Sequence, residues 1–458
     1  MKSYTASLAD YVVETKYEDL PKEVVSKIKL LIMDCMANMV GGAKMEPARI
    51  VQELFLQYGG TEEATVFSNG KKLPVPHATY INSFLANALD FDDTYHNFAH
   101  PGATVIPAAL ALAEKTAASG KELITAIVLG YEVSLRIGHA IMPTKERRDQ
   151  VWGFATWQAF GSAVSAAKLL RLSREQVRDA FGHVGMSAPL PSVRKEGLEQ
   201  EDRPFTWLKN NYGWASMAGV VAGELASRDF VGNNSILDGD HGFWVMAGSD
   251  QCDFEALTKE LGSKYLCQDT SFKPYAACRW THASIDAARV IREKYGLMID
   301  EVDSVRISTF GEAKRSLSEA HPANIIDAQF SLPYLVALEL GNKSSSRGLN
   351  EADFKESKMY HLSESVYIEV NEDFDRDFVR DGQMKACMEV TLKNGGLVSE
   401  TVDIPKGDPR NPFTELEIKE KFLHLVHTEN GQEIEMLRNI ELLEEVDDIN
   451  NLFYSWKK

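Results

Sequence analysis

The chain has 458 residues, of which 44% are hydrophobic and 25% are charged, and its formal net charge at pH 7 is -18. This composition is typical of an ordinary globular protein with room for two or three domains. The acidic balance argues against a non-specific nucleic-acid binder and against a protein that binds anionic membranes, because both need a basic face. A small anionic substrate is compatible with it, provided that cations gather around the site.

The five cysteines are scattered and include no Cys-x-x-Cys pair, so the sequence predicts neither a disulfide framework nor an iron–sulfur or zinc ribbon. A reducing cytoplasm is the expected compartment. The N-terminal segment is interrupted by acidic side chains and lacks the apolar core of a signal peptide. With no run of about 18 uninterrupted apolar residues, the sequence also predicts no membrane span.

Apolar residues at three- and four-residue steps predict helices through most of the first half. The first helix begins near Pro21 and ends at Gly41-Gly42, and the second ends at Gly59-Gly60. A short strand or turn is expected over 64–67, and a third helix over 76–89 leads into a polar cluster. Two tracts rich in small residues predict closely packed helices. Further helices are predicted over 106–118, 122–141, 160–170 and 176–184.

The pattern changes near Cys267, where apolar and polar residues begin to alternate in short runs. This alternation predicts strands over 302–309 and 365–370 and a hairpin over 386–404. Helices are expected between them, and the chain returns to a helical pattern over 414–453. The sequence therefore predicts a mainly α protein with an inserted α+β domain. Its helical domain is discontinuous, formed by residues 1–267 and 405–458, and its α/β domain is formed by residues 268–404.

The densest polar cluster lies within residues 88–107. It combines three carboxylates, a hydroxyl and two histidines: Asp90, Asp92, Asp93, Thr94, His96 and His100. It could hold a metal ion, it could be an acidic helix end, or it could be a metal-free acid–base site. The acid–base interpretation fits best, because Asp90, Asp93 and Thr94 stand one turn apart in a helix and His100 could close the same wall. Asp92 and His96 are interpreted as local structure.

A second cluster, at residues 272–282, gathers the cations that an anionic substrate needs. Lys273, Arg279 and His282 lie within ten residues, with Tyr275 between them, and they open a helix whose N-terminus adds positive potential. The alternative is an ordinary charged surface at a domain junction. Cys278 has cationic neighbours that could activate it as a nucleophile, but a buried and inert cysteine is more usual.

A third candidate segment covers residues 207–213. Lys209 could add another cation there, and Tyr212 could act as a proton donor. A helix N-terminus with surface charge is an equally compatible interpretation of this segment.

Several longer motifs resemble those of one protein family. The most specific is Leu89-Asp90-Phe91-Asp92-Asp93-Thr94, followed by His100-Pro101-Gly102 and Pro107-Ala108. Supporting motifs are Leu31-Ile32-Met33-Asp34, Gly130-Tyr131-Glu132-Val133, the segment 273–282 and Ala328-Gln329-Phe330-Ser331-Leu332-Pro333-Tyr334. Over almost its whole length the chain resembles the MmgE/PrpD family, whose members include 2-methylcitrate dehydratase, decarboxylases and epimerases of small carboxylic acids.

The resemblance implies a large helical domain made from both chain ends, a smaller lid domain inserted between them, and a homodimer. It also implies cofactor-free chemistry on small di- and tricarboxylates in a cleft between the domains. Position by position, it assigns catalytic roles to Asp90, Thr94 and His100, and it identifies Lys273 and Lys209 as lysines of the site.

The chain departs from the family pattern at three positions. Cys278 stands where the decarboxylase has a histidine, and Gly153-Phe154-Ala155 lacks the histidine of a Gly-Phe-His segment. Asn211 stands where many members have another histidine. The first two departures weaken an assignment to itaconate formation or to ordinary methylcitrate dehydration. His282 is a candidate for the missing imidazole.

The sequence therefore predicts a lyase, without metal or cofactor, that removes a proton α to a carboxylate and then eliminates water or carbon dioxide. The residues expected to be catalytic are His100, positioned by Asp90 and Thr94, together with Asp93 and His282. Those expected to bind the substrate are Lys273, Arg279, Lys209, Tyr212 and Tyr275. The alternatives are an epimerase or isomerase that uses the same proton transfer, and a catalytically inactive carboxylate-binding homologue.

Overall fold

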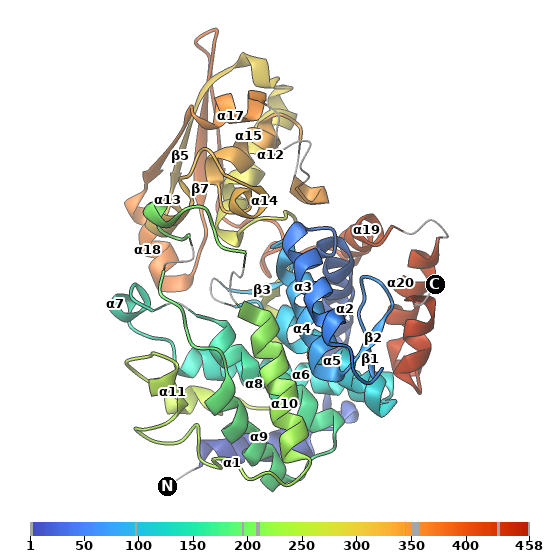
Figure 1. Ribbon diagram of the computed structural model, residues 1–458. Helices are drawn as coiled ribbons and strands as arrows, with labels where there is room; N and C mark the ends of the chain where they lie inside the picture. Colours follow the sequence, from blue (N-terminus) through green and yellow to red (C-terminus); the bar gives the residue numbers. More distant parts are fainter. Residues whose placement is uncertain are drawn as a thin grey trace.

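Helices dominate the first half of the chain (Figure 1). The computed structural model describes residues 3–96, 99–151, 153–194, 197–207, 211–343, 345–349, 357–427 and 431–456. The longer helices of this half are α1 (Tyr4–Glu14), α2 (Lys22–Gly42), α3 (Glu46–Tyr58), α4 (Val75–Ala88), α5 (Pro101–Thr116), α6 (Gly120–Ala140), α8 (Ala155–Leu169), α9 (Arg174–Ser187) and α10 (Tyr212–Ala226). Shorter elements are β1 (Ala64–Thr65), β2 (Lys72–Leu73), α7 (Lys145–Arg148) and α11 (Phe243–Met246).

The helices expected from the apolar spacing are confirmed, but α5 and α8 each begin five residues earlier than predicted. The apolar spacing predicted a helix over 106–118, whereas α5 begins at Pro101. Proline is favoured at the first helical position, because no helical partner is lost there with its missing N–H. Pro107 lies inside α5 and cannot donate to the carbonyl of Ala103. Ser83 of α4 donates to that carbonyl instead, at 2.6 Å.

Small residues let the central helices approach closely, as the sequence predicted. A Cβ at Gly130 of α6 would lie 2.8 Å from the carbonyl oxygen of Gly161 on α8. A Cβ at Gly219 of α10 would lie 2.5 Å from the backbone nitrogen of Ala163 on α8. The backbones of three helices therefore meet around α8.

Helix α6 is long and apolar enough to cross a membrane by length and composition. Its apolar stretch is nevertheless 94% buried among the other elements. This burial is what a core helix of a globular protein shows, and it agrees with the expectation that the chain contains no membrane span.

The second half contains a four-stranded sheet of order β6-β5-β7-β8. Strand β5 (Val302–Thr309) runs parallel to β6 (Val366–Val370) and antiparallel to β7 (Ala386–Leu392), which forms a hairpin with β8 (Leu397–Val402). These strands confirm the alternating pattern. Helix α12 (His282–Tyr295) packs against β7 and β8, and α15 (Leu332–Leu340) packs against α12 (Figure 1). The remaining helices of this part are α13 (Gly311–Leu317), α14 (Ile325–Ala328), α17 (Ser357–Ser363) and α18 (Glu372–Asp381).

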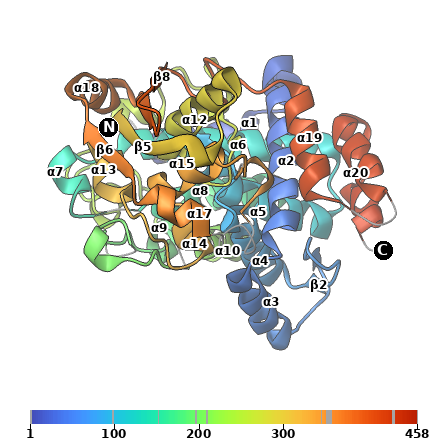
Figure 2. The same cartoon turned by 90° about the horizontal axis from the view of Figure 1, so that it is seen from above.

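The C-terminal segment returns to the helices of the first half. It contains α19 (Glu415–Leu425) and α20 (Gln432–Glu441), as the helical pattern predicted. Helix α19 packs against α2, with α20 beside it (Figure 2). The chain is therefore mostly helical with a small mixed part, and the exact domain boundaries at 267/268 and 404/405 stay a prediction.

Candidate active site

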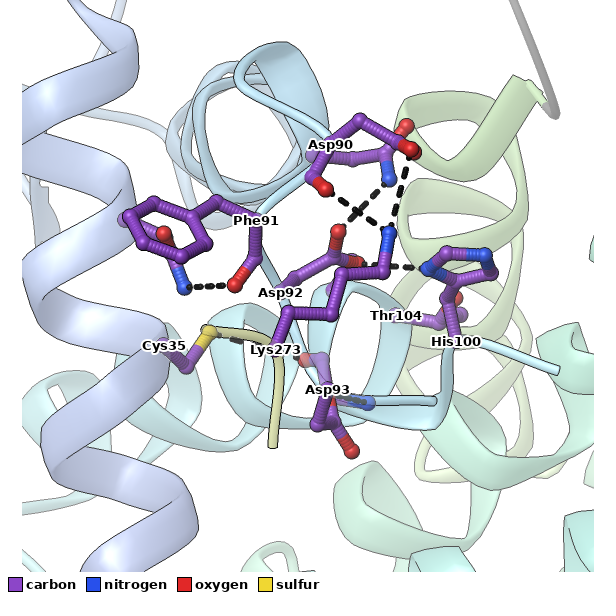
Figure 3. Close-up of polar contacts among 12 residues, drawn as sticks. Cys35, Asp90, Phe91, Asp92, Asp93, His100, Thr104 and Lys273 are labelled. Atoms are coloured by element: carbon purple, nitrogen blue, oxygen red, sulfur yellow. Dashed lines mark hydrogen bonds and ion pairs between the residues drawn. The ribbon is translucent and has the colours of Figure 1, made fainter. Parts of the chain in front are cut away.

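Two short strands bring together the polar clusters that lie far apart in the sequence. Strand β3 (Thr94–Tyr95) pairs antiparallel with β4 (Thr270–Ser271). The pairing places Lys273 beside the loop that follows α4, 183 positions away from Asp90. The fully buried Lys273 ammonium donates to the Asp90 carbonyl oxygen at 2.7 Å and lies 3.1 Å from Asp90 Oδ2 (Figure 3). The 272–282 cluster thus supplies a cation to the acidic one.

The acidic loop, residues 89–93, is not helical, which changes the roles expected of its carboxylates. Helix α4 ends at Ala88, and Asp90 takes a left-handed conformation with φ of 51°. The one-turn spacing that would have aligned three residues on one wall therefore does not apply. Asp90 and Asp92 turn toward Lys273, whereas Asp93 lies apart from them (Figure 3).

Asp92 orients His100. The Asp92 Oδ2 lies 3.2 Å from His100 Nδ1, and its Oδ1 accepts a hydrogen bond from the Asn87 side chain at 2.9 Å. This contact corrects the expectation that Asp90 and Thr94 position His100, and that Asp92 is only local structure. With Nδ1 bonded to a carboxylate, Nε2 is the ring nitrogen available for proton exchange with a substrate.

Neighbouring helices hold the rest of His100. Gln158 of α8 accepts from the His100 backbone N–H at 3.1 Å and donates to its carbonyl oxygen at 2.8 Å. The ring of Tyr212, at the start of α10, lies 5.6 Å from the imidazole between centroids. The His100 side chain is 14% exposed, while the Asp92 side chain is 1% exposed. The imidazole is therefore partly open to solvent, whereas the carboxylate that orients it is buried.

The adjacent carboxyl groups of Asp92 and Asp93 differ in charge. Burial alone would raise the pKa of Asp92, but the nearby His100 and Lys273 outweigh burial, so this pKa lies below its ordinary value. Burial, together with the charges of Asp92 and Asp34, raises the pKa of Asp93 to about 8. At neutral pH Asp92 is therefore the charged partner of His100, and Asp93 is largely protonated.

Asp93 forms its hydrogen bonds with α5 and α6 rather than with His100 or Lys273. Its Oδ1 accepts from the backbone N–H of Gly102 at 3.1 Å, and its Oδ2 from the Tyr131 hydroxyl at 3.0 Å. A Cβ at position 102 would lie 2.1 Å from Asp93 Oδ1, which explains the glycine there. Thr94 is buried on β3, and its hydroxyl has no hydrogen-bond partner among the residues that the structure describes.

The other cations of the 272–282 cluster contact residues outside the acidic loop. Arg279 Nη1 donates to the Lys406 carbonyl at 3.0 Å and lies 3.1 Å from His282 Nδ1. His282 is fully buried, and its Nε2 lies 3.1 Å from the Ala277 carbonyl oxygen. Burial, Arg279 and Lys273 hold the pKa of His282 well below its ordinary value, so it is neutral. The Tyr275 hydroxyl donates to Asp286 at 2.7 Å.

These contacts leave His282 no free ring nitrogen for a substrate proton. Arg279 differs, because its Nε and Nη2 have no hydrogen-bond partner within the described ranges, although Nη2 lies 3.9 Å from Asp408. Lys209 lies outside the described residues, so its predicted place at the site stays a prediction. Ala155, where a histidine was expected from the family pattern, is the first residue of α8.

A cavity of about 930 Å³ has Leu89, the first residue of the acidic loop, in its wall. Its walls include two lysines, a histidine and an exposed tryptophan: Lys44, Lys343, His424 and Trp207. A second cavity of about 20 Å³ adjoins it, sharing Pro47, Trp207 and Ile326, and extends to Asn87 and Tyr212. Asn87 contacts Asp92 and the Tyr212 ring lies against His100, so the narrow cavity ends beside residues that contact the cluster.

The cluster also resembles a cation site. Donor atoms of Asp90, Asp92 and His100 all lie within 4.8 Å of one another, which is the set of oxygen and nitrogen ligands that a divalent metal accepts. The Lys273 ammonium already lies 3.1 Å from one of these carboxylates. A metal ion would therefore have to compete with a buried lysine for the same oxygens.

Four residues around the site were missed by the sequence reasoning. Asp34, Asn87 and Gln158 are buried polar residues on mostly apolar stretches of helix, a pattern that could have indicated buried hydrogen-bonding roles. Lys421, which forms an ion pair with Asp34, lies in a helix rich in charged residues and gave no comparable signal.

Comparisons with known proteins cover nearly the whole chain. The MmgE/PrpD N-terminal domain model matches residues 6–255, and the MmgE/PrpD C-terminal domain model matches residues 275–443. Cis-aconitate decarboxylase of Homo sapiens is 26% identical over 438 residues, which cover 92% of this chain and 87% of the relative. The same enzyme of Aspergillus terreus is 24% identical over 472 residues, with 97% and 92% covered. Cis-aconitate decarboxylase-like protein oryM of Aspergillus oryzae is 24% identical over 481 residues, with 98% and 96% covered.

Proposed function

We propose that this chain, which belongs to the MmgE/PrpD family, is a cofactor-independent lyase that acts on a small di- or tricarboxylate. The family and the decarboxylases to which the chain is similar support a lyase and leave its subclass open. The observation that carries the proposal is the pairing of two dyads in one buried cluster, His100 with Asp92 and Lys273 with Asp90.

The first step proposed is removal of a proton from a carbon α to a substrate carboxylate. The imidazole Nε2 of His100 accepts this proton, and the charged Asp92 stabilises the imidazolium that forms. The electron pair of the broken C–H bond moves into the carboxylate, whose growing negative charge needs a cation nearby. Lys273 supplies this cation when its ammonium exchanges its contact with Asp90 for one with the substrate carboxylate.

The second step decides the subclass. In a dehydration, the electron pair returns to form the carbon–carbon double bond, and hydroxide leaves with a proton from the enzyme as water. In a decarboxylation, His100 returns its proton to another carbon of the conjugated carbanion, the C–C bond to a carboxylate then breaks, carbon dioxide leaves, and the electron pair of that bond takes up a second proton, from solvent. Cys278 stands where the decarboxylase has a histidine and argues against decarboxylation, whereas Ala155 stands where many family members have a histidine and weakens both assignments. The proposal therefore covers either elimination.

Three further features belong to the same proposal. The part formed by residues 268–404 acts as a lid over the helical part, because it carries Lys273 to the cluster through the β3–β4 pairing. The protein forms a homodimer, and it works in the cytoplasm. Gel filtration with light scattering tests the dimer, and cell fractionation tests the compartment.

The deciding experiment is NMR of the protein mixed with citrate-like, aconitate-like and amino-dicarboxylate compounds in deuterated buffer. Elimination without added metal or cofactor is the expected result, and His100→Ala should lower its rate by about two orders of magnitude or more. His183→Ala is the matched control, because that histidine lies on α9 and its ring Nε2 lies 2.7 Å from the Phe230 carbonyl oxygen.

Each outcome of this experiment has one meaning. Deuterium exchange without elimination would replace the lyase with an epimerase. Binding by calorimetry without any turnover would indicate an inactive carboxylate-binding homologue. Loss of activity after chelation, with recovery on adding a divalent metal, would overturn the metal-free mechanism.

A further inference from the structure

A buried ion pair lies directly behind the acidic loop, and no step of the proposed reaction uses it. The Nζ of Lys421, on α19, lies 2.7 Å from Asp34 Oδ1 on α2, and the two side chains are 6% and 1% exposed. The same ammonium donates to the Phe91 carbonyl oxygen at 2.6 Å and to the Lys273 carbonyl oxygen at 3.3 Å. It also lies 3.7 Å from the centre of the Phe91 ring.

We propose that Lys421, held by Asp34, is a positioning residue that fixes the acidic loop against the segment of Lys273. The inference rests on the function proposed above, because it assigns the ion pair to the geometry of that reaction. It adds a residue from the C-terminal helices to a site whose other members come from the first half and from the 272–282 cluster.

The first argument is the place of Phe91 in the chain. It lies between Asp90 and Asp92, so the direction of its carbonyl sets the peptide plane that leads into the partner of His100. Asn38 donates to the same carbonyl at 3.2 Å and to Asp34 Oδ2 at 3.1 Å. Two donors, one from α2 and one from α19, therefore hold this one carbonyl.

The second argument is the backbone conformation of Asp90. A non-glycine residue with positive φ is uncommon and persists only where its surroundings fix it. The Asp90 carbonyl is held by the Lys273 side chain, and the next carbonyl, that of Phe91, is held by Lys421. Because Lys421 also bonds the Lys273 main chain, one ammonium connects both sides of the Asp90–Lys273 contact.

The third argument is that a buried ion pair is an expensive way to hold two segments together. Burial lowers the pKa of Lys421 and raises that of Asp34, and each partner opposes the shift of the other. Apolar residues of similar size often stabilise a fold as well as such a pair does. The carbonyl bonds are what an apolar replacement could not provide.

The decisive variant removes both charges together. Lys421→Met alone leaves Asp34 buried without a counter-ion, so it should lower the melting temperature and could prevent folding. Asp34→Asn with Lys421→Met leaves no unpaired charge, and Asn can still bond Asn38, so the melting temperature should recover. We expect kcat of this double variant to stay about 10- to 100-fold below wild type, as for reacting groups misplaced by about 1 Å, with KM changed much less.

A readout independent of turnover is the crystal structure of the double variant. We expect the 3.2 Å contact between Asp92 and His100 and the 3.1 Å contact between Lys273 and Asp90 to lengthen or to become disordered. The matched control is Lys168→Met, because the Lys168 ammonium also holds three carbonyls, those of Val12, Val13 and Thr15, away from the cluster. It should lower stability without changing kcat.

A double variant that folds, keeps both contacts and retains wild-type kcat would overturn the inference, since the pair would then be structural only. If the wild-type protein converts no carboxylate at all, the proposed function fails. In that case the Asp92–His100 and Lys273–Asp90 distances in the double variant still show whether the ion pair positions the acidic loop or only stabilises the fold. The two failures can therefore be told apart.

Discussion

Replacing Asp92 with asparagine tests the assignment of His100 most directly. The variant removes a charge 3.2 Å from His100 Nδ1 while keeping the size of a side chain that is 1% exposed. Two unit charges at this distance attract by about 5 kcal/mol at an effective dielectric constant of about 20, which is an upper limit. A charge-assisted hydrogen bond contributes about 1.5–3 kcal/mol net. At 1.4 kcal/mol per factor of ten, kcat/KM should fall about 10- to 150-fold.

The assay is a double-mutant cycle of Asp92→Asn with His100→Ala, measured as kcat/KM on the substrate found by NMR. Because Asp92 acts through the imidazole, its replacement should have little further effect once the imidazole is absent. Asp90→Asn is the matched comparison, since Asp90 contacts Lys273 and its effect should add to that of His100→Ala. Wild-type kcat/KM in Asp92→Asn, or fully additive effects of Asp92 and His100, would refute the role given to the pair.

Three further outcomes are expected. Lys273→Met removes the buried cation of the cluster, so calorimetry should show at least about tenfold weaker binding of a carboxylate inhibitor, and unchanged affinity would contradict its role. The pKa of Asp93 is about 8 in the folded protein and about 4 in an unfolded chain, so the contribution of Asp93 to stability is lost as pH rises toward 8. The free energy of unfolding in urea should therefore decline less between pH 5 and 8 in Asp93→Asn than in the wild type. An equally steep decline would be evidence against this charge state. Ser83→Ala leaves the Ala103 carbonyl without a donor and should cost about 1–3 kcal/mol, whereas the exposed Ser187→Ala should cost less than about 0.5 kcal/mol; equal losses would argue against the compensation at Pro107.

Much of the fold could be predicted because its helices and strands bury one face at a regular period. The α2 stripe and the alternation along β5 are local patterns, and both were found. The start of α5 was predicted five residues too late, because the apolar spacing is clear only from Ile106, whereas Pro101 fits the first helical position. Local rules therefore served well wherever the structure depends on neighbours in sequence.

The candidate site was less predictable, because contacts between distant segments decide its geometry. The motif indicated the importance of Asp90 and His100, but a helical spacing gave His100 the wrong carboxylate partner. The β3–β4 pairing involves two residues from each strand, too few to leave a pattern. Lys421 is one of many charged residues in α19, and only the packing of α19 on α2 makes it exceptional.

The bond between Lys421 and the Phe91 carbonyl spans 330 positions of the chain, which has a consequence for the order in which the protein matures. Helices of the first half can form and pack before α19 has been synthesised. Contacts between such distant positions close more slowly than local ones. An incomplete chain, whether growing on a ribosome or cut by a protease before α19, therefore carries His100 and its acidic neighbours without the last bond that shapes them.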